Sequence, residues 1–221
     1  MKRLELSREK LLAIYLILVY IVGIVGILLP IHEQFILLTP INLLFSLAVV
    51  LLVHPKWEGK IITVLIGTYI TGFSAEVVGV QTHLLFGAYR YGATLGPKIF
   101  GTPFIIGVNW TLLVYASSAI VQRHFYKFSL RLKAAIGASL MVFLDLFIEP
   151  VAVKQDFWSW GEAGANHFLV APLQNYLVWW IIAFGLVAFT LSFSRPFHNK
   201  IAELLYVLQL VFFITLNVFL Q

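Results

Sequence analysis

Three carboxylic acids stand in stretches of the chain that are otherwise strongly apolar. Glu76 lies near the end of one stretch, and Asp145 and Glu149 lie four residues apart in another. On a continuous helix, residues four apart share one face. Ionisable groups inside a membrane are costly and therefore mark candidate functional sites. Carboxyl groups held in an apolar site also suit acid–base catalysis, because one can give a proton while another takes one.

Other polar and aromatic residues gather in the same two stretches, which run from Gly72 to Trp110 and from Asp145 to Trp180. We expect the carboxylic acids to be catalytic: Asp145, Glu149 and Glu76. We expect the remaining members of the group to bind substrate: Tyr89, Tyr91, Asn109, Trp110, Trp158, Trp160, Asn175 and His83.

Each of these residues also has a purely structural interpretation. Glu149 precedes Pro150 and could simply end its helix. Asp145 could pair with Arg90, and Glu76 could pair with Arg90 or Lys98. Tyrosines and tryptophans commonly form a belt at the membrane surface, and asparagines form hydrogen bonds between membrane helices. The convergence of all of these features on one side of the membrane favours the functional interpretation.

Several kinds of chemistry are disfavoured by what the sequence lacks. It contains no cysteine, which excludes disulfides, thiolate catalysis and cysteine-ligated metals. Its six histidines form no array with metal-ligand spacing, and we find no phosphate-binding glycine loop and no serine nucleophile motif. We therefore expect no metal and no cofactor. The absence of a basic patch interleaved with aromatic residues argues against nucleic acid as a partner.

The elements that position these residues are predicted to be membrane-spanning helices. Of the 221 residues, 61% are hydrophobic and only 11% are charged, whereas a soluble domain averages about 25% charged residues. Apolar stretches of about 20 residues are long enough to cross the hydrocarbon core. Seven such stretches are present: 11–29, 35–53, 60–80, 101–121, 134–151, 173–193 and 201–220. We predict an all-α, polytopic helical bundle that forms a single integral membrane domain over residues 1–221.

The distribution of basic residues predicts how the bundle is oriented. If seven helices alternate in direction, twelve of the 15 Lys and Arg residues fall on one side, and only Arg90, Lys98 and Lys154 fall on the other. By the positive-inside rule, the N-terminus is then cytoplasmic. The 11–29 stretch is too long for a signal-peptide core, so we expect it to be retained as the first helix. The candidate site then lies near the outer leaflet of the cell membrane.

The two polar stretches resemble a family of membrane carotenoid-biosynthesis proteins. That family includes carotenoid 1,2-hydratases of the CruF type and archaeal bisanhydrobacterioruberin hydratases. The first block of matching residues is Gly72, Phe73, Glu76, Gly79, Thr82, Phe86, Gly87, Tyr89, Tyr91, Gly92, Leu95, Gly96, Pro97, Pro103, Asn109 and Trp110. The second block is Asp145, Glu149, Pro150, Trp158, Trp160, Pro172, Asn175, Tyr176 and Trp179. His83 departs from the pattern, because a glycine is expected after Thr82.

The resemblance implies a hydratase that adds water across the terminal C=C bond of an acyclic carotenoid and forms a tertiary alcohol. Asp145 or Glu149 would protonate the alkene, and Glu76 would orient or deprotonate the attacking water, although these roles could be exchanged. Asn109 and Asn175 would hold that water. The aromatic residues would stabilise the carbocation through their ring faces. The expected partners are the carotenoid and membrane lipid, together with other carotenoid enzymes with which the protein could associate.

Two other classes of function compete with hydration. A carotenoid end-group cyclase or isomerase would use the same acid and the same carbocation, but would lose a proton instead of gaining water. A lipid-binding, carotenoid-binding or transport protein would do no chemistry; a transporter would favour internal repeats, which the sequence lacks. An oxygen-dependent hydroxylase is disfavoured by the missing histidine array.

Overall fold

The computed structural model describes residues 7–161 and 169–220, so Lys2 and Arg3, which entered the charge count, lie outside the described residues. Within the described part, the helices are α1 (Arg8–Leu28), α2 (His32–Ile36), α3 (Thr39–Leu52), α4 (Gly59–Thr82), α5 (Ile105–His124), α6 (Leu130–Lys154), α7 (Leu173–Phe193) and α8 (Lys200–Phe219). The strands are β1 (Tyr89–Tyr91), β2 (Lys98–Ile99), β3 (Thr102–Pro103) and β4 (Trp158–Trp160). The predicted all-α bundle is confirmed.

Most of the predicted membrane spans are present as single long helices. Of the described helices, α1, α4, α5, α6, α7 and α8 are long and apolar enough to cross a membrane. The chain is therefore a multi-pass membrane protein. The predicted span 35–53 is instead divided between α2 and the 14-residue α3, which rises only about 21 Å. Pro40 lies in the first turn of α3, where its missing N–H is tolerated but where its ring prevents a helix from continuing through.

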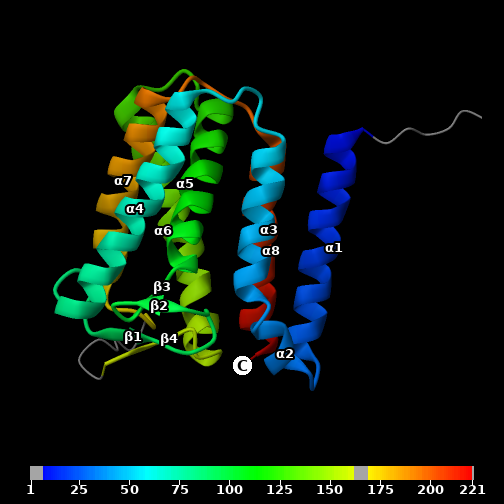
Figure 1. Cartoon of the computed structure of the whole chain (residues 1–221), viewed down its shortest axis with the longest axis vertical. Helices are drawn as coiled ribbons and strands as arrows, with labels where there is room; N and C mark the ends of the chain where they lie inside the picture. Colours follow the sequence, from blue (N-terminus) through cyan, green and yellow to red (C-terminus); the bar gives the residue numbers. More distant parts are fainter. Residues whose placement is uncertain (1–6, 162–168, 221) are drawn as a thin grey trace, which may run out of the picture.

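Helix α5 lies at the centre of the bundle, where it packs against α3, α4, α6, α7 and α8. Figure 1 shows α4, α5, α6 and α7 grouped together, with α3 and α8 beside them and α1 at the edge. Helix α1 packs chiefly against α8 and α2, and most of its surface remains exposed. The bundle thus has a tightly packed part around α5 and a loosely covered part beside α1.

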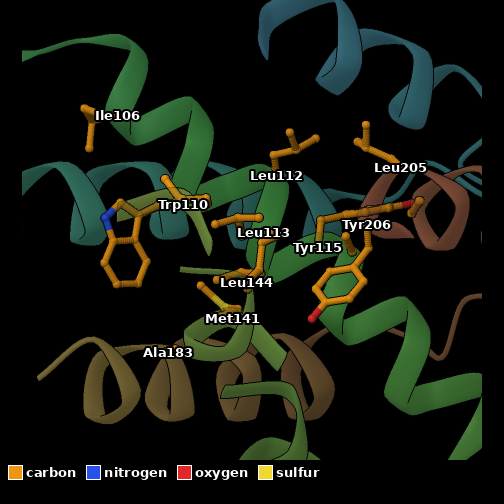
Figure 2. Close-up of a cluster of buried hydrophobic side chains, with 14 of the residues drawn as sticks. Ile106, Trp110, Leu112, Leu113, Tyr115, Met141, Leu144, Ala183, Leu205 and Tyr206 are labelled. Atoms are coloured by element: carbon orange, nitrogen blue, oxygen red, sulfur yellow. The ribbon is translucent and has the colours of Figure 1, made fainter. Parts of the chain in front are cut away.

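The core around α5 is built from large side chains that fit against small ones. Trp110, Leu113, Met141 and Leu144 are fully buried, and Ala183 of α7 meets them with no exposed surface (Figure 2). Small residues such as alanine let membrane helices approach closely, and this close packing drives their association because lipid provides no hydrophobic drive. Here it holds α6 and α7 against α5.

The strands form two small antiparallel sheets at one end of the bundle, which we call the strand end (Figure 1). In the first sheet, β1 pairs with β4 so that Tyr89 lies opposite Trp160 and Tyr91 lies opposite Trp158. In the second, β2 and β3 form a hairpin whose turn residues, Phe100 and Gly101, both have positive φ. Two-residue hairpin turns favour such backbone angles, since their twist matches that of the strands.

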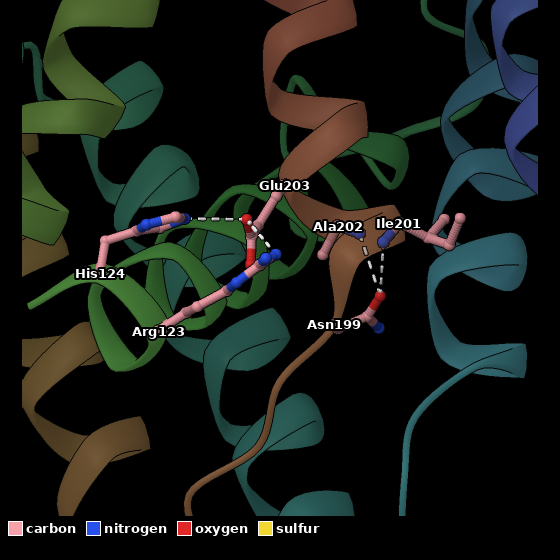
Figure 3. A network of polar contacts seen from close by, with 6 residues as sticks. All are labelled: Arg123, His124, Asn199, Ile201, Ala202 and Glu203. Carbon is pink, nitrogen blue, oxygen red and sulfur yellow. Dashed lines mark hydrogen bonds and ion pairs between the residues drawn. The ribbon is translucent and has the colours of Figure 1, made fainter. Parts of the chain in front are cut away.

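A polar network fastens the opposite end of the bundle (Figure 3). Asn199 caps α8 by accepting hydrogen bonds from the backbone N–H groups of Ile201 and Ala202 at 3.1 and 3.0 Å. Its amide also donates to the carbonyl of Val50 and to the hydroxyl of Tyr115. Nearby, Arg123 and His124 of α5 contact Glu203 of α8 (Figure 3). Asn199 thereby connects α8 to both α3 and α5.

Replacing Asn199 with alanine is expected to destabilise the fold by about 2 kcal/mol or more, because it removes a helix cap and leaves a buried carbonyl unpaired. Thermal unfolding of the purified protein in detergent, followed by circular dichroism, measures the loss. Ser129→Ala is the matched control, since Ser129 caps α6 through one exposed 3.3 Å bond. Equal melting temperatures for Asn199→Ala and the unmodified protein would contradict this assignment.

Candidate active site

The three predicted carboxylic acids meet in one buried cavity at the strand end. Glu76 comes from α4, and Asp145 and Glu149 come from α6; each is at most 3% exposed. The space that the centre of a water-sized molecule can occupy in it is about 30 Å³. Its lining residues are Glu76, Tyr89, Tyr91, Ile106, Asn109, Asp145, Ile148, Glu149, Trp158, Trp160, Asn175 and Trp179.

Glu76 accepts hydrogen bonds from three side chains. The hydroxyls of Tyr89 and Tyr91 donate to its Oε2 atom at 2.6 and 2.8 Å, and Nε1 of Trp110 donates to its Oε1 atom at 3.1 Å. An ionised carboxylate offers about four lone-pair sites, so roughly one remains for a further donor. Glu76 is thus held rigidly as a hydrogen-bond acceptor.

Glu149 connects the acid cluster to the sheet. Its Oε2 atom accepts hydrogen bonds from the indole N–H groups of Trp158 and Trp160, at 3.1 and 2.8 Å. The α6 helix continues through Pro150 to Lys154, so Glu149 does not end its helix, and Asp145 and Glu149 share one face as predicted. Pairing with β1 brings the two tryptophans against Tyr89 and Tyr91.

Within the described part of the chain, Asp145 accepts a single, long hydrogen bond, whereas the other two acids accept two or three shorter ones. Its Oδ2 atom accepts from the amide of Asn175, on α7, at 3.3 Å. Among the described residues, its Oδ1 atom has no hydrogen-bond partner, and the residue lines the cavity. Asp145 therefore has an oxygen free to exchange a proton with a molecule in the cavity.

Two stacked tryptophans close the cavity on the side of α5 and α7. The ring centroids of Trp110 and Trp179 lie 4.0 Å apart, and only Trp179 reaches the cavity lining. Gly72 lies directly against the Trp110 ring, so α4 approaches α5 closely and brings Glu76 within reach of the indole N–H. A side chain at position 72 would displace that ring.

No cation compensates the acids within the described residues. The ion pairs formed there involve only Glu58 and Glu203, and Arg90 instead donates to the hydroxyl of Ser159 at 3.2 Å. A structural pair between Arg90 and Glu76 or Asp145 is therefore not formed. Burying several charges without partners is costly, which favours a site that keeps at least one proton.

The two tyrosines that hold Glu76 stay neutral over a wide pH range. Burial raises the pKa of both Tyr89 and Tyr91 above its ordinary value, and the nearby Glu76 carboxyl adds to the effect. A raised phenol pKa means that the hydroxyl keeps its proton well into the alkaline range. Both residues therefore remain donors to Glu76 at any pH at which the protein would work.

Removing the phenol hydroxyls one at a time is expected to weaken the activity of the site. A hydrogen bond to a charged group contributes about 1.5–3 kcal/mol, so Tyr89→Phe should lower turnover by about ten- to a hundredfold. Tyr69→Phe, which removes a phenol hydroxyl that donates to the Phe104 carbonyl, is the control. Product formation by purified variants measures both, and unchanged turnover in Tyr89→Phe would show that Glu76 needs no such support.

The structure brings together all of the predicted site residues except His83. Asn109 lines the cavity, and its amide has no hydrogen-bond partner in the part of the chain that the structure describes. Trp110 lies behind Trp179 but contacts Glu76 directly. His83 is exposed and ends α4 with a φ of 59°; it occupies the left-handed cap position that glycine usually takes, which explains why glycine was expected there.

Sequence reasoning missed the roles of Trp179, Ile106 and Ile148, which complete the cavity lining. It also missed the strands. The alternation in Tyr89–Tyr91 and in Trp158–Trp160 has the two-residue period of a strand, and that signal could have predicted them. Among the described residues, no group of three or more His, Asp or Glu side chains could hold a metal ion.

Comparisons with known proteins relate the chain to carotenoid biosynthesis. A protein-family model described as "Carotenoid biosynthesis protein" matches residues 36–221. The chain is also 28% identical over 137 residues to bisanhydrobacterioruberin hydratase from Haloarcula japonica. That match covers 59% of this chain but only 45% of the relative, so the chain spans less than half of the protein that it matches. No solved structure matches the chain.

Proposed function

This chain belongs to the carotenoid biosynthesis protein family, and from that premise we propose that it is a hydratase, which adds water across the terminal C=C bond of an acyclic carotenoid. One observation carries the proposal. Acids from two different helices line one buried aromatic cavity, and they differ in their hydrogen bonds: Glu76 is held by three donors, whereas Asp145 has a free oxygen.

The first step is protonation of the alkene. In this proposal, Asp145 in its protonated form gives its proton to C2 of the end group, which leaves a tertiary carbocation at C1. An alkene is a weak base, so the acid must be close and shielded from bulk water. Aromatic faces stabilise a desolvated cation by about 2 kcal/mol or more, and Tyr89, Trp160 and Trp179 line the cavity. Glu149 positions the tryptophans and is the alternative acid.

The second step is capture of water. A water molecule attacks C1, and the proton that it releases passes to Glu76, which is held as an acceptor. The unpartnered amide of Asn109 orients that water, and Asn175 supports Asp145. Transfer of the proton from Glu76 back to the Asp145 carboxylate, through water in the cavity, restores the starting state. The reaction consumes one water and needs no cofactor.

A carotenoid end-group cyclase or isomerase is the second candidate. It would share the first step and then release a proton from carbon. The fixed acceptor Glu76 and the amide of Asn109 favour water capture over this route. A non-catalytic carotenoid-binding or transport protein is less well supported, since binding a hydrocarbon does not call for three buried acids without a cation.

We further propose that the protein lies in the cell membrane with its N-terminus in the cytoplasm and its active site near the outer leaflet. The connections that carry most of the basic residues, α3–α4, α5–α6 and α7–α8, all lie at the end opposite the strands (Figure 1). The positive-inside rule assigns that end to the cytoplasm.

The proposed function is tested by expressing the protein in a host that makes acyclic carotenoids and measuring the mass of the products. Hydration adds the mass of one water for each end that reacts. A changed chromophore with unchanged mass would instead support cyclisation or isomerisation. Unchanged carotenoids in a host that produces the protein in its membrane would overturn the enzymatic assignment.

A further inference from the structure

The cavity that holds the acids is too small for a whole carotenoid. The space that the centre of a water-sized molecule can occupy there is about 30 Å³, which is room for one or two water molecules. It can hold the attacking water, whereas the reacting end and the long polyene behind it must extend into adjoining space. That space must be continuous with the acid cavity.

A larger apolar chamber adjoins the acid cavity. It leaves about 80 Å³ for the centre of a water-sized molecule and lies between α1, α3, α5, α6 and α8. The two spaces share four lining residues, namely Ile106, Asn109, Ile148 and Trp158. The rest of the chamber wall is mostly aliphatic and aromatic, with Leu43, Phe213 and Leu216 among its members. A polyene extending from the acids would enter this chamber directly.

The chamber in turn adjoins a groove beside α1. The groove leaves about 290 Å³ for the centre of a water-sized molecule, and it shares Tyr20, Ile27, Thr39, Asn42 and Phe212 with the chamber. On its outer side lie residues that are about half exposed, such as Leu18, Val22 and Leu38. In a membrane these surfaces face lipid. The three spaces thus adjoin one another in a row from lipid to the acids, on the side where the bundle is loosely covered.

From this continuity we propose that the polyene tail of the substrate lies in the chamber and in the α1 groove, and that the end group reaches the acids from lipid by passing between α1 and α3. This inference rests on the proposed function and adds the route and the tail site. It commits to an acyclic polyene as the occupant, because an apolar, elongated path leading to buried acids suits a long hydrocarbon with one reactive end. The enzyme would then select substrates by the length of the hydrocarbon behind the reacting bond.

Blocking the chamber separates tail binding from chemistry. Leu43→Trp places a bulky ring in the chamber wall, and Leu44→Trp is its matched control on the same helix, since Leu44 is 52% exposed and lines none of the three spaces. At the groove, Val22→Trp is paired with Ile21→Trp in the same way. Each variant is purified in detergent and its folding is checked by thermal unfolding. Each is then assayed with a long acyclic carotenoid and with a short acyclic isoprenoid that has the same terminal double bond.

We expect Leu43→Trp to lower turnover of the long substrate by about tenfold or more, while turnover of the short substrate is unchanged. Val22→Trp should show the same selectivity to a smaller degree, and both controls should behave like the unmodified protein. Equal turnover of the long substrate by Leu43→Trp and Leu44→Trp would overturn the route, as would equal loss of both substrates. If the unmodified protein hydrates neither substrate, the proposed function itself fails, which is a distinguishable result.

Discussion

Asp145→Asn is expected to lower hydration by about a hundred- to ten-thousandfold, the usual contribution of a general acid. Asparagine has nearly the same size as aspartic acid and can still accept the hydrogen bond from Asn175, but it has no carboxyl proton to give to an alkene. The fold should be preserved, because no ion pair is lost. Turnover of the purified variant with an acyclic carotenoid measures the effect.

Asp156→Asn provides the matched control, since Asp156 is exposed after the end of α6 and does not line the cavity. Glu149→Gln should cost less than Asp145→Asn, because a glutamine oxygen can still accept the two indole hydrogen bonds. Wild-type turnover in Asp145→Asn, with a large loss in Glu149→Gln, would transfer the acid role to Glu149.

Glu76→Gln is expected to cause a loss of similar size, about a hundredfold or more, but at a later step. The substitution replaces one of the two acceptor oxygens with an NH₂ group, which then faces either the hydroxyls of Tyr89 and Tyr91 or the indole N–H of Trp110. It also removes the base for water. Protonation by Asp145 should continue. In heavy water, the Glu76→Gln variant should therefore introduce deuterium into unreacted carotenoid, whereas Asp145→Asn should introduce none.

Glu33→Gln is the control for this experiment, because Glu33 is exposed on the short helix α2 and lies outside the cavity. If Glu76→Gln neither hydrates nor exchanges, Glu76 acts at or before protonation, and the roles of the two acids must be exchanged. If it hydrates at the normal rate, Glu76 has only a structural role.

Much of the fold and the acid cluster could be predicted from the sequence, because both follow from short-range patterns. Hydropathy marks the long helices, and the four-residue spacing of Asp145 and Glu149 fixes them on one helix face. The alternation of connections that are rich and poor in basic residues places Glu76 at the same end of the bundle as Asp145 and Glu149. All three expectations depend on spacing within single elements or on alternation between them.

The remaining features depend on contacts between distant segments. The pairing of Tyr89–Tyr91 with Trp158–Trp160 joins two connections about 70 residues apart, and nothing local specifies a partner for either. Trp179 was expected to match the family but was given no role in the site, although it stacks on Trp110 inside the bundle. Pro40 was expected within a span, but it marks the beginning of a shorter helix.

The most direct measurement follows isotopes through the reaction of the purified protein with an acyclic carotenoid. In ¹⁸O-labelled water, the tertiary alcohol should carry the labelled oxygen, and in heavy water the neighbouring carbon should gain one deuterium. Both labels together would establish protonation followed by water capture at this site. Oxygen that comes from O₂ instead of water, or a product without added oxygen, would contradict the central claim that this cavity hydrates a carotenoid end group.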